Sequence, residues 1–173
     1  MILMKGQDIL VLMKLLLLDG RKFQVHALAK ELAISPSELS KSIHRCIFAG
    51  LLDPIERKCN RGAFLEFMLH GFPYVFPVKP GELTRGIPTA HSAPPLKEKI
   101  LSKIDYVWPF PEGTGRGQAI RPIYKSVPLA AMKDPPLYRL LSLADALRAG
   151  LTRERSIASE IFKDMVLKGD SWT

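Results

Sequence analysis

Apolar residues dominate positions 6–18 and cover most of the circumference of a helix. A helix with this pattern must be covered on more than one side, either by the C-terminal helices or by a second copy of the chain. Lys5, Asp8 and Lys14 interrupt the run, which falls short of the about 18 apolar residues of a membrane span and has no cleavage site after it. We therefore expect a buried first helix in a cytoplasmic protein without a membrane segment.

Two short helices joined by a tight turn are predicted between residues 23 and 52. The first, at about 25–32, carries a single apolar stripe at helical spacing. Ser35 then serves as an N-cap, Pro36 occupies the first helical position, where a missing N–H costs nothing, and Glu38 completes a Ser-x-x-Glu capping box. These features agree and predict a second helix that begins at Pro36.

The second helix is amphipathic, and Gly50, just past its last periodic residue, predicts its end. One side must face the core and carries Leu39, Ile43, Cys46 and Ile47. The opposite side carries small, hydroxylated and cationic side chains, which suit contacts with base edges in the major groove of DNA. The side chains predicted to contact bases are Ser37, Ser40, Lys41, His44 and Arg45.

The run LAKELAISPSELS at 28–40, together with AGLL at 49–52, resembles the winged helix-turn-helix of MarR-like bacterial transcriptional regulators. The resemblance covers roughly the first third of the chain. It implies a mainly α fold, in which a winged helix-turn-helix domain is followed by a proline-rich, loop-rich segment and a C-terminal helical pair. The motif does not define a target, because repressors, activators, antitoxins and some protein-binding modules share it.

The segment after the second helix carries the expected wing and several cations. Residues 51–55 can form a first wing strand, which Pro54 confines to a sheet edge, and 56–58 would form the tip. Where a second strand would follow, Asn60 instead caps a predicted helix at 61–70, so the wing is expected to be short or absent. Phosphate contacts, or alternatively a solvated turn, are predicted for the cations Arg21, Lys22, Arg57, Lys58 and Arg61.

The composition changes between residues 72 and 128, which hold ten of the fourteen prolines. Prolines at this density exclude long helices. The segment is nevertheless too rich in aromatic and β-branched residues for a disordered linker. We expect an ordered, loop-rich segment with short extended pieces at 73–78 and 104–108 and one short helix at 96–104.

A helical pattern returns near the end of the chain. Asp134 and Pro135 begin a predicted helix at 135–149 that is apolar on much of its surface, and an amphipathic helix follows at 152–167. We expect this pair to wrap the first helix or to join two subunits. The predicted organisation is a DNA-binding domain at 1–71, the proline-rich segment at 72–128, and a helical hairpin for dimerisation or partner binding at 129–173.

The formal net charge of +8 and a pI near 9.6 favour a polyanionic partner, with nucleic acid ahead of an anionic membrane. A generally basic protein without an anionic ligand is the alternative. Together with the resemblance, the charge favours a sequence-specific double-stranded DNA-binding regulator. We expect a repressor that acts as a homodimer on an inverted-repeat operator.

A second hypothesis is a protein-binding module. The run DALR at 145–148, with RER at 153–155, loosely resembles the tails of bacterial winged-helix proteins encoded beside toxin genes. This resemblance implies an antitoxin-like protein, in which the proline-rich centre and the C-terminal helices neutralise an operon-encoded partner. The helix-turn-helix would then serve autorepression or act as a scaffold.

No enzyme, metal or cofactor chemistry is expected. The glycines of EGTGRG at 112–117 lack the Lys-Ser/Thr of a P-loop, so we predict a flexible loop in which Arg116 can touch a phosphate. The four histidines lack metal-site spacing, and His91 has neighbouring hydroxyls but no acidic residue near it in the sequence. Cys46 and Cys59 are not spaced as a metal or redox pair, and Cys46 is expected to be a buried free thiol.

Overall fold

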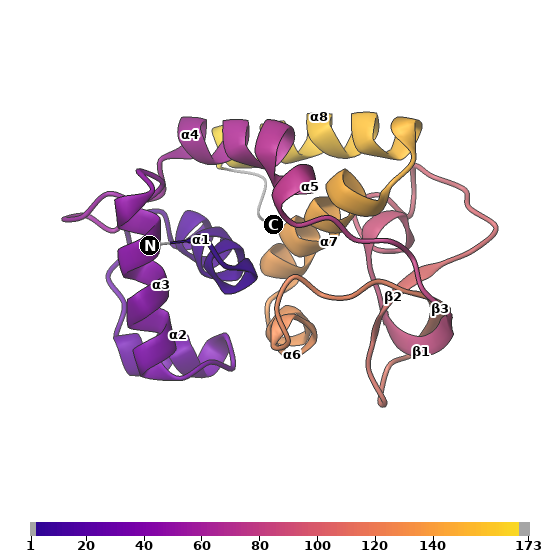
Figure 1. The fold of residues 1–173 in the computed structure, drawn as a ribbon, viewed down its shortest axis with the longest axis horizontal. Coiled ribbons are helices and arrows are strands. Elements are labelled where there is room, and N and C mark those ends of the chain that lie inside the picture. The colour runs from indigo at the N-terminus through magenta and orange to yellow at the C-terminus, as the bar shows by residue number, and fades with distance from the viewer. Residues whose placement is uncertain (1–2, 170–173) are drawn as a thin grey trace.

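The computed structural model describes residues 3–169, in which helices from both ends of the sequence pack together and a small sheet lies at one end of the molecule (Figure 1). The helices of the N-terminal part are α1 (Gly6–Leu18), α2 (Val25–Glu31), α3 (Pro36–Phe48), α4 (Arg61–Glu66) and α5 (Phe72–Val75), with a π-helical turn, Phe67–Gly71, between the last two. The strands are β1 (Leu83–Pro88), β2 (Tyr106–Pro109) and β3 (Gly115–Ala119), with a 3-10 turn, Ala90–Ser92, after β1. The last helices are α6 (Val127–Lys133), α7 (Pro135–Ala149) and α8 (Thr152–Lys168).

The expected fold class is wrong, because the proline-rich segment forms a three-stranded mixed sheet and the fold is α/β rather than a mainly α winged helix with a C-terminal helical pair. Strand β1 pairs antiparallel with both β2 and β3, and β2 pairs parallel with β3, so the three strands close on one another. The sequences LTRGIP and GRGQA of β1 and β3 lack an alternation of apolar and polar residues, so no period-two pattern marks them.

The predicted wing strand at 51–55 is also absent. Between α3 and α4 the chain makes one isolated bridge, Leu52 with Cys59. Residues 53–58 turn back on themselves, and the Asp53 carboxylate accepts hydrogen bonds from the backbone N–H groups of Ile55 and Glu56, at 2.8 and 2.6 Å. This side-chain cap replaces strand pairing, so the segment is a loop, named here the 53–58 loop.

The other short elements of the central segment differ from expectation in part. The predicted extended piece at 73–78 begins as helix α5, and 96–104 contains turns but no helix. The predicted extended piece at 104–108 is confirmed in part as β2. The predicted helix at 61–70 begins at Arg61 as α4 and then widens into the π-helical turn.

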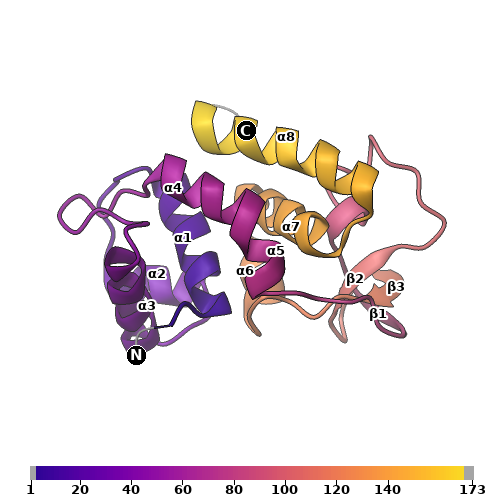
Figure 2. The same cartoon turned by 45° about the horizontal axis from the view of Figure 1, so that its top comes forward.

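Helix α1 lies at the centre of the core and is covered within the chain. Its residues Ile9 to Met13 have no exposed surface, and α3 packs on one side of the helix while α7 packs on another. Helix α8 covers α7 in turn and also contacts α4 (Figure 2). The apolar surfaces of α1 and α7 therefore do not require a second copy of the chain. Within residues 3–169 no helix has both the length and the apolar character needed to cross a membrane.

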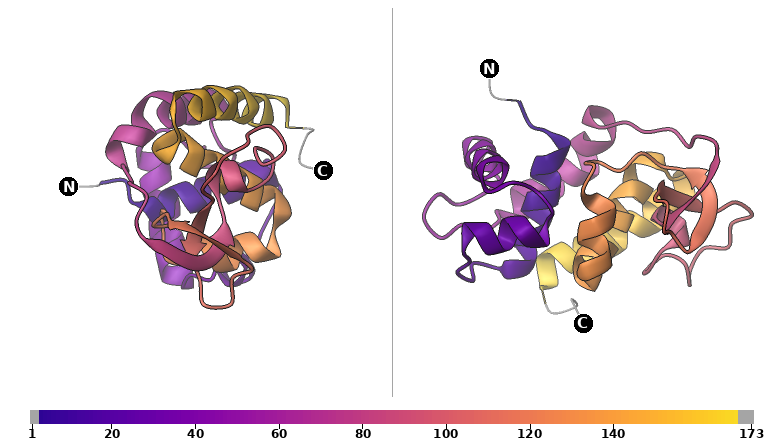
Figure 3. Two further views of the ribbon diagram at one scale, coloured as in Figure 1. Left: turned by 90° about the vertical axis from the view of Figure 1, so that its right-hand side faces the viewer. Right: turned by 90° about the horizontal axis from the view of Figure 1, so that it is seen from below.

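Buried polar contacts fix the sheet and the helices relative to one another. The Lys14 ammonium of α1 donates to the Asp134 carboxylate at the start of α7, at 2.6 Å. On α7, the Asp145 carboxylate accepts from the Thr89 hydroxyl at 2.7 Å and from the Trp108 indole N–H at 2.5 Å. Asp134 therefore connects α7 to α1, and Asp145 connects α7 to Trp108 of β2. Because both carboxylates are hydrogen-bonded in this way, α7 joins α1 to the sheet. The views in Figure 3 show α7 between the two.

Candidate nucleic-acid interface

Helix α3 begins and ends at the predicted residues, but the Glu38 side chain pairs with Lys41 and does not complete the predicted capping box. The Ser35 hydroxyl accepts a hydrogen bond from the backbone N–H of Glu38 at 3.2 Å, and Pro36 holds the first helical position. Gly50 follows the helix with a φ of 74°, the left-handed conformation that glycine adopts without steric cost. Leu39 and Cys46 are fully buried against the rest of the core, so the orientation of the helix about its axis is fixed.

The outward face of α3 is open to solvent. Ser37, Lys41 and His44 are exposed, Ser40 is half-buried, and Phe48 keeps 71% of its surface exposed. Lys41 pairs with Glu38 at 3.1 Å, but its side chain remains 61% exposed. Figures 1 and 2 show α3 at the end of the molecule opposite the sheet, and within residues 3–169 no other helix or strand lies over its outer side. Four of the five residues predicted to contact bases therefore lie on one accessible surface.

Arg45 does not belong to this surface. Its guanidinium donates to both oxygens of the Asp8 carboxylate, at 2.7 and 2.8 Å, and to the Ser42 hydroxyl at 3.0 Å. The Asp8 side chain is fully buried and that of Arg45 is 12% exposed, so the guanidinium faces α1. These hydrogen bonds raise the pKa of Arg45 above its usual value, although burial opposes the shift. The predicted base contact of Arg45 is therefore wrong. Helical periodicity placed Arg45 on the polar face of α3 but could not reveal its partner, Asp8 in α1.

Three of the five predicted phosphate contacts are engaged within the chain. Arg21 donates to the carbonyl oxygens of Leu17 and Leu18 at the end of α1, at 3.0 Å each. Lys58 and Arg61 pair with Asp19, at 3.4 and 3.1 Å. Arg61 also donates to the carbonyl oxygen at position 166 of α8, at 2.9 Å. Arg61 therefore has mainly a structural role, whereas Arg21 and Lys58 keep exposed side chains.

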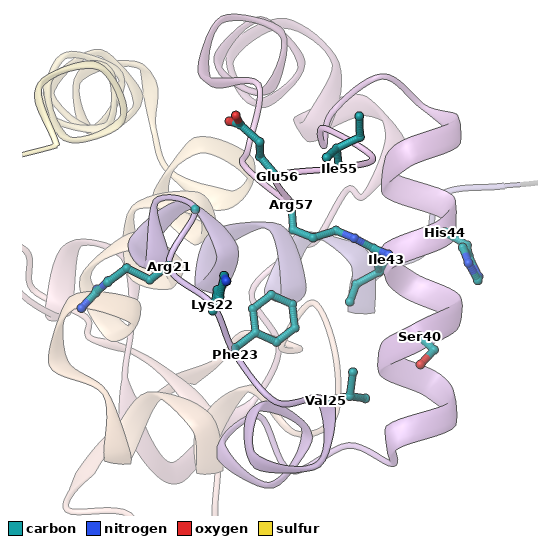
Figure 4. A pocket seen from close by; sticks show the side chains of 11 residues that line it. Arg21, Lys22, Phe23, Val25, Ser40, Ile43, His44, Ile55, Glu56 and Arg57 are labelled. Carbon is teal, nitrogen blue, oxygen red and sulfur yellow. The ribbon is translucent and has the colours of Figure 1, made fainter.

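The other two predicted cations are free of such contacts. Lys22 is exposed, and within residues 3–169 neither Lys22 nor Arg57 forms an ion pair. Arg57 has a φ of 55°, a left-handed conformation that costs a residue other than glycine about 1 kcal/mol. The 53–58 loop holds this conformation, which directs the Arg57 side chain toward α3 (Figure 4).

A basic hollow of about 410 Å³ lies between α3, the 53–58 loop and the connection from α1 to α2. It brings together residues of both predicted sets, namely Arg21, Lys22, Ser40, His44 and Arg57. The rest of its lining is Gly20, four apolar side chains and one acidic side chain, namely Phe23, Val25, Ile43, Ile55 and Glu56. The hollow continues the outward face of α3 into a groove with three cations at its margin (Figure 4).

Groups with other chemistry are held in inert surroundings. Both cysteines are free and buried, and burial raises the pKa of Cys59 to about 12 and that of Cys46 still further. The acidic neighbour that His91 lacks in the sequence comes from α8, where Glu154 Oε2 lies 3.6 Å from His91 Nδ1. The hydroxyls beside His91 are engaged elsewhere, since Thr89 donates to Asp145 and Ser92 accepts from a backbone N–H. Within residues 3–169 no three His, Cys, Asp or Glu side chains are grouped to hold a metal ion.

Comparisons of the chain with models of protein families, with curated proteins and with solved structures find no match.

Proposed function

We propose that this chain is a cytoplasmic, sequence-specific regulator of transcription that binds double-stranded DNA through α3. The proposal is carried by one observation: the hydroxylated and cationic face of α3 lies uncovered at one end of the molecule, beside the basic hollow. An exposed helix of this width fits the major groove of B-DNA, and its short polar residues allow close approach to base edges.

The contacts divide by chemistry. Ser37, Lys41 and His44 donate to base edges in the major groove, which gives the complex its sequence preference. Lys22 and Arg57, on the connection and loop beside α3, contact phosphates and set the register without discriminating between sequences. Ser40 lies at the margin of the hollow and contacts either group.

Each chain supplies one such helix, so we propose that two copies bind an inverted repeat with half-sites about 34 Å apart. The partner surface in this dimer is not the apolar side of α1 or α7, because both are covered within the chain. Sedimentation of the protein with its selected duplex tests the stoichiometry, and two chains per operator are expected.

Selection of bound sequences from a random duplex pool is the primary test, followed by affinity measurements on variants. The Ser37→Ala/His44→Ala variant should lose about 1 to 3 kcal/mol of discrimination at the contacted base pairs. Lys22→Ala/Arg57→Ala should weaken selected and random duplexes alike. Lys163→Ala, an exposed cation on α8, is the matched control and should bind as the native chain does. Native affinity and selectivity in Ser37→Ala/Lys41→Ala/His44→Ala would contradict the proposal.

A second candidate is the antitoxin-like binding of an operon-encoded protein. It is favoured by Leu101, which is fully exposed, and by Leu151, 71% exposed, because both line a hollow of about 260 Å³ near the start of α8. Exposed large apolar side chains around a hollow are typical of protein contacts. Purification distinguishes the two candidates: a monodisperse protein that binds its own promoter supports the regulator, and insolubility cured by a neighbouring gene product supports the partner role.

A further inference from the structure

Two arginines face each other across the sheet at the end of the molecule opposite α3. Strands β1 and β3 pair antiparallel with Arg85 opposite Arg116, and both residues are exposed. Directly opposed residues of an antiparallel pair place their side chains on the same face of the sheet, and like charges in this arrangement repel each other. The repulsion is a cost that a bound anion would remove.

No carboxylate within residues 3–169 pairs with these two arginines. Within the described residues neither Arg85 nor Arg116 has an ion pair or a side-chain hydrogen bond. The nearest acidic residues in the sequence, Glu82 and Glu112, are exposed, and neither pairs with Arg85 or Arg116. The two guanidinium groups therefore keep their donors free.

The arginines line an open hollow of about 510 Å³ whose other lining residues are Thr84, Gly113, Thr114 and Gly115. This lining contains two hydroxyl groups and no acidic side chain. The loop that carries part of this lining is packed tightly against β1. A Cβ atom at Gly113 would lie 2.2 Å from the backbone of Gly86, and the Gly113 N–H donates to the Phe110 carbonyl at 3.0 Å. The glycines expected to give a flexible loop instead let it pack against β1.

We propose that this hollow binds a dianionic phosphate group between Arg85 and Arg116. A tetrahedral dianion offsets both positive charges, and its oxygens can accept from both guanidinium forks and from the Thr114 hydroxyl. A carboxylate carries one charge and two oxygens, which one arginine fork satisfies. The proposal is independent of DNA binding by α3, because the two surfaces lie at opposite ends of the molecule.

The test is a titration of the full ¹⁵N-labelled chain with inorganic phosphate at constant ionic strength, at about pH 8, where a phosphomonoester is a dianion. The Nε–H resonances of Arg85 and Arg116, assigned from single Arg→Gln variants, should shift saturably, together with the backbone amide resonances of Gly113, Thr114 and Gly115 in the same hollow. In Arg85→Gln/Arg116→Gln, followed by these backbone amides, the affinity should fall about tenfold or more, as expected on loss of charge-assisted hydrogen bonds. Arg153→Gln/Lys163→Gln removes the same charge from exposed positions on α8 and should retain native affinity.

Two further ligands identify the source of the phosphate. Phenyl phosphate, a phosphomonoester dianion, should bind as inorganic phosphate does if the site serves a small ligand. Equal binding of dimethyl phosphate, a diester monoanion, would contradict the selection of a dianion and indicate a nucleic-acid backbone as the ligand instead. Non-saturating shifts with all three ligands, or an equal response in Arg85→Gln/Arg116→Gln, would overturn the proposal. Variants of α3 should leave this titration unchanged, so its result is independent of the DNA-binding test.

Discussion

At the residue scale, the Asp8 carboxylate is the group on which the position of α3 depends most. It is fully buried, accepts hydrogen bonds from Arg45 and Ser42, and caps the start of α1 by accepting from the Lys5 backbone N–H at 2.8 Å. Gln7, beside it, bonds Ser42 and the carbonyl oxygen of Glu38. A buried charge is tolerated because each of its oxygens is satisfied. These contacts fix which face of α3 remains outside.

Arg45→Ala should therefore act on stability. It leaves the Asp8 charge buried without its cation, which should cost about 3 kcal/mol of unfolding free energy. Urea denaturation followed by circular dichroism measures this loss. Lys41→Ala, which breaks only an exposed pair, should change the unfolding free energy by less than about 0.5 kcal/mol. If Arg45→Ala left the urea midpoint unchanged and altered the base preference, this would contradict the structural role and indicate that Arg45 contacts bases.

Stability should also fall in mildly alkaline solution because of the buried thiols. The folded chain raises the pKa of Cys59 to about 12 and that of Cys46 further, whereas unfolded thiols titrate near about 8.5. Above that pH the unfolded state binds fewer protons than the folded state, so the unfolding free energy falls as pH rises.

The expected loss is about 2 kcal/mol per thiol between about pH 8.5 and 10. Within this pH range the loss of unfolding free energy comes from the thiols and not from the buried tyrosine. The pKa of Tyr138 is raised to about 12 by burial, so its contribution begins only above about pH 10. Urea midpoints across this range give the slope, and Cys46→Ala/Cys59→Ala should abolish it. The same slope in that variant would assign the pH dependence to other groups.

At the element scale, α1 and α7 are joined at the start of α7 by Asp134. Its carboxylate accepts from the backbone N–H of Leu137 at 3.1 Å, as an N-cap, and from Lys14 at 2.6 Å. Lys14 also pairs with Glu31 at the end of α2, at 2.8 Å. Burial lowers the pKa of Lys14, but the hydrogen bonds that its ammonium donates to these two carboxylates outweigh burial and raise the pKa above its usual value. The charged form of Lys14 thus holds three helices together.

Asp134→Ala should destabilise the chain by about 2 kcal/mol, since it removes both an N-cap and a half-buried ion pair. Asp134→Asn keeps the capping oxygen and should recover about half of the loss. Asp164→Ala removes an exposed pair with Lys168 on α8 and should cost less than about 0.5 kcal/mol. Thermal unfolding of the four proteins checks the order, and equal losses in Asp134→Ala and Asp134→Asn would show that capping contributes nothing.

The helices were predictable from the sequence and the sheet was not. The predicted helix at 135–149 matches α7 in full, and Pro36 begins α3 as expected, because caps and helical periodicity are local properties. Strands β1 and β3 pair with each other across 29 to 35 positions of the chain, and their glycines are required by close backbone approach rather than by any local pattern. The prediction of a mainly α fold was wrong because it did not include these strands.

At the scale of the whole molecule, the residues on the outward face of α3 could be predicted from the sequence, but the partners of its buried polar residues could not. Ser37, Lys41 and His44 could be placed outward by periodicity alone. Arg45 could not be placed in this way, because its partner, the Asp8 carboxylate, lies in α1, a helix that begins 39 positions before Arg45. The sequence does contain one signal for this pair. An isolated acidic residue such as Asp8 within an apolar run indicates that a cation from elsewhere in the chain is buried beside it.

The distribution of free cations predicts a steep dependence of DNA affinity on salt. Lys22 and Arg57 of each chain contact phosphates in the proposed complex, so a dimer neutralises about four phosphates. Affinity should then fall about a hundredfold between 50 and 200 mM salt. Lys22→Ala/Arg57→Ala should reduce the slope of log affinity against log salt by about four, whereas Lys163→Ala should leave it unchanged. A native chain without salt dependence would exclude this set of phosphate contacts.

The most direct test of the account is to map amide chemical shifts of the full ¹⁵N-labelled chain on addition of a duplex selected from a random pool. We predict the largest changes at Ser37, Lys41 and His44 and in the 53–58 loop, with little change along α7 and α8. Changes confined to the sheet or to α8, or a selected duplex that leaves α3 unaffected, would contradict the claim that α3 is the DNA-binding helix.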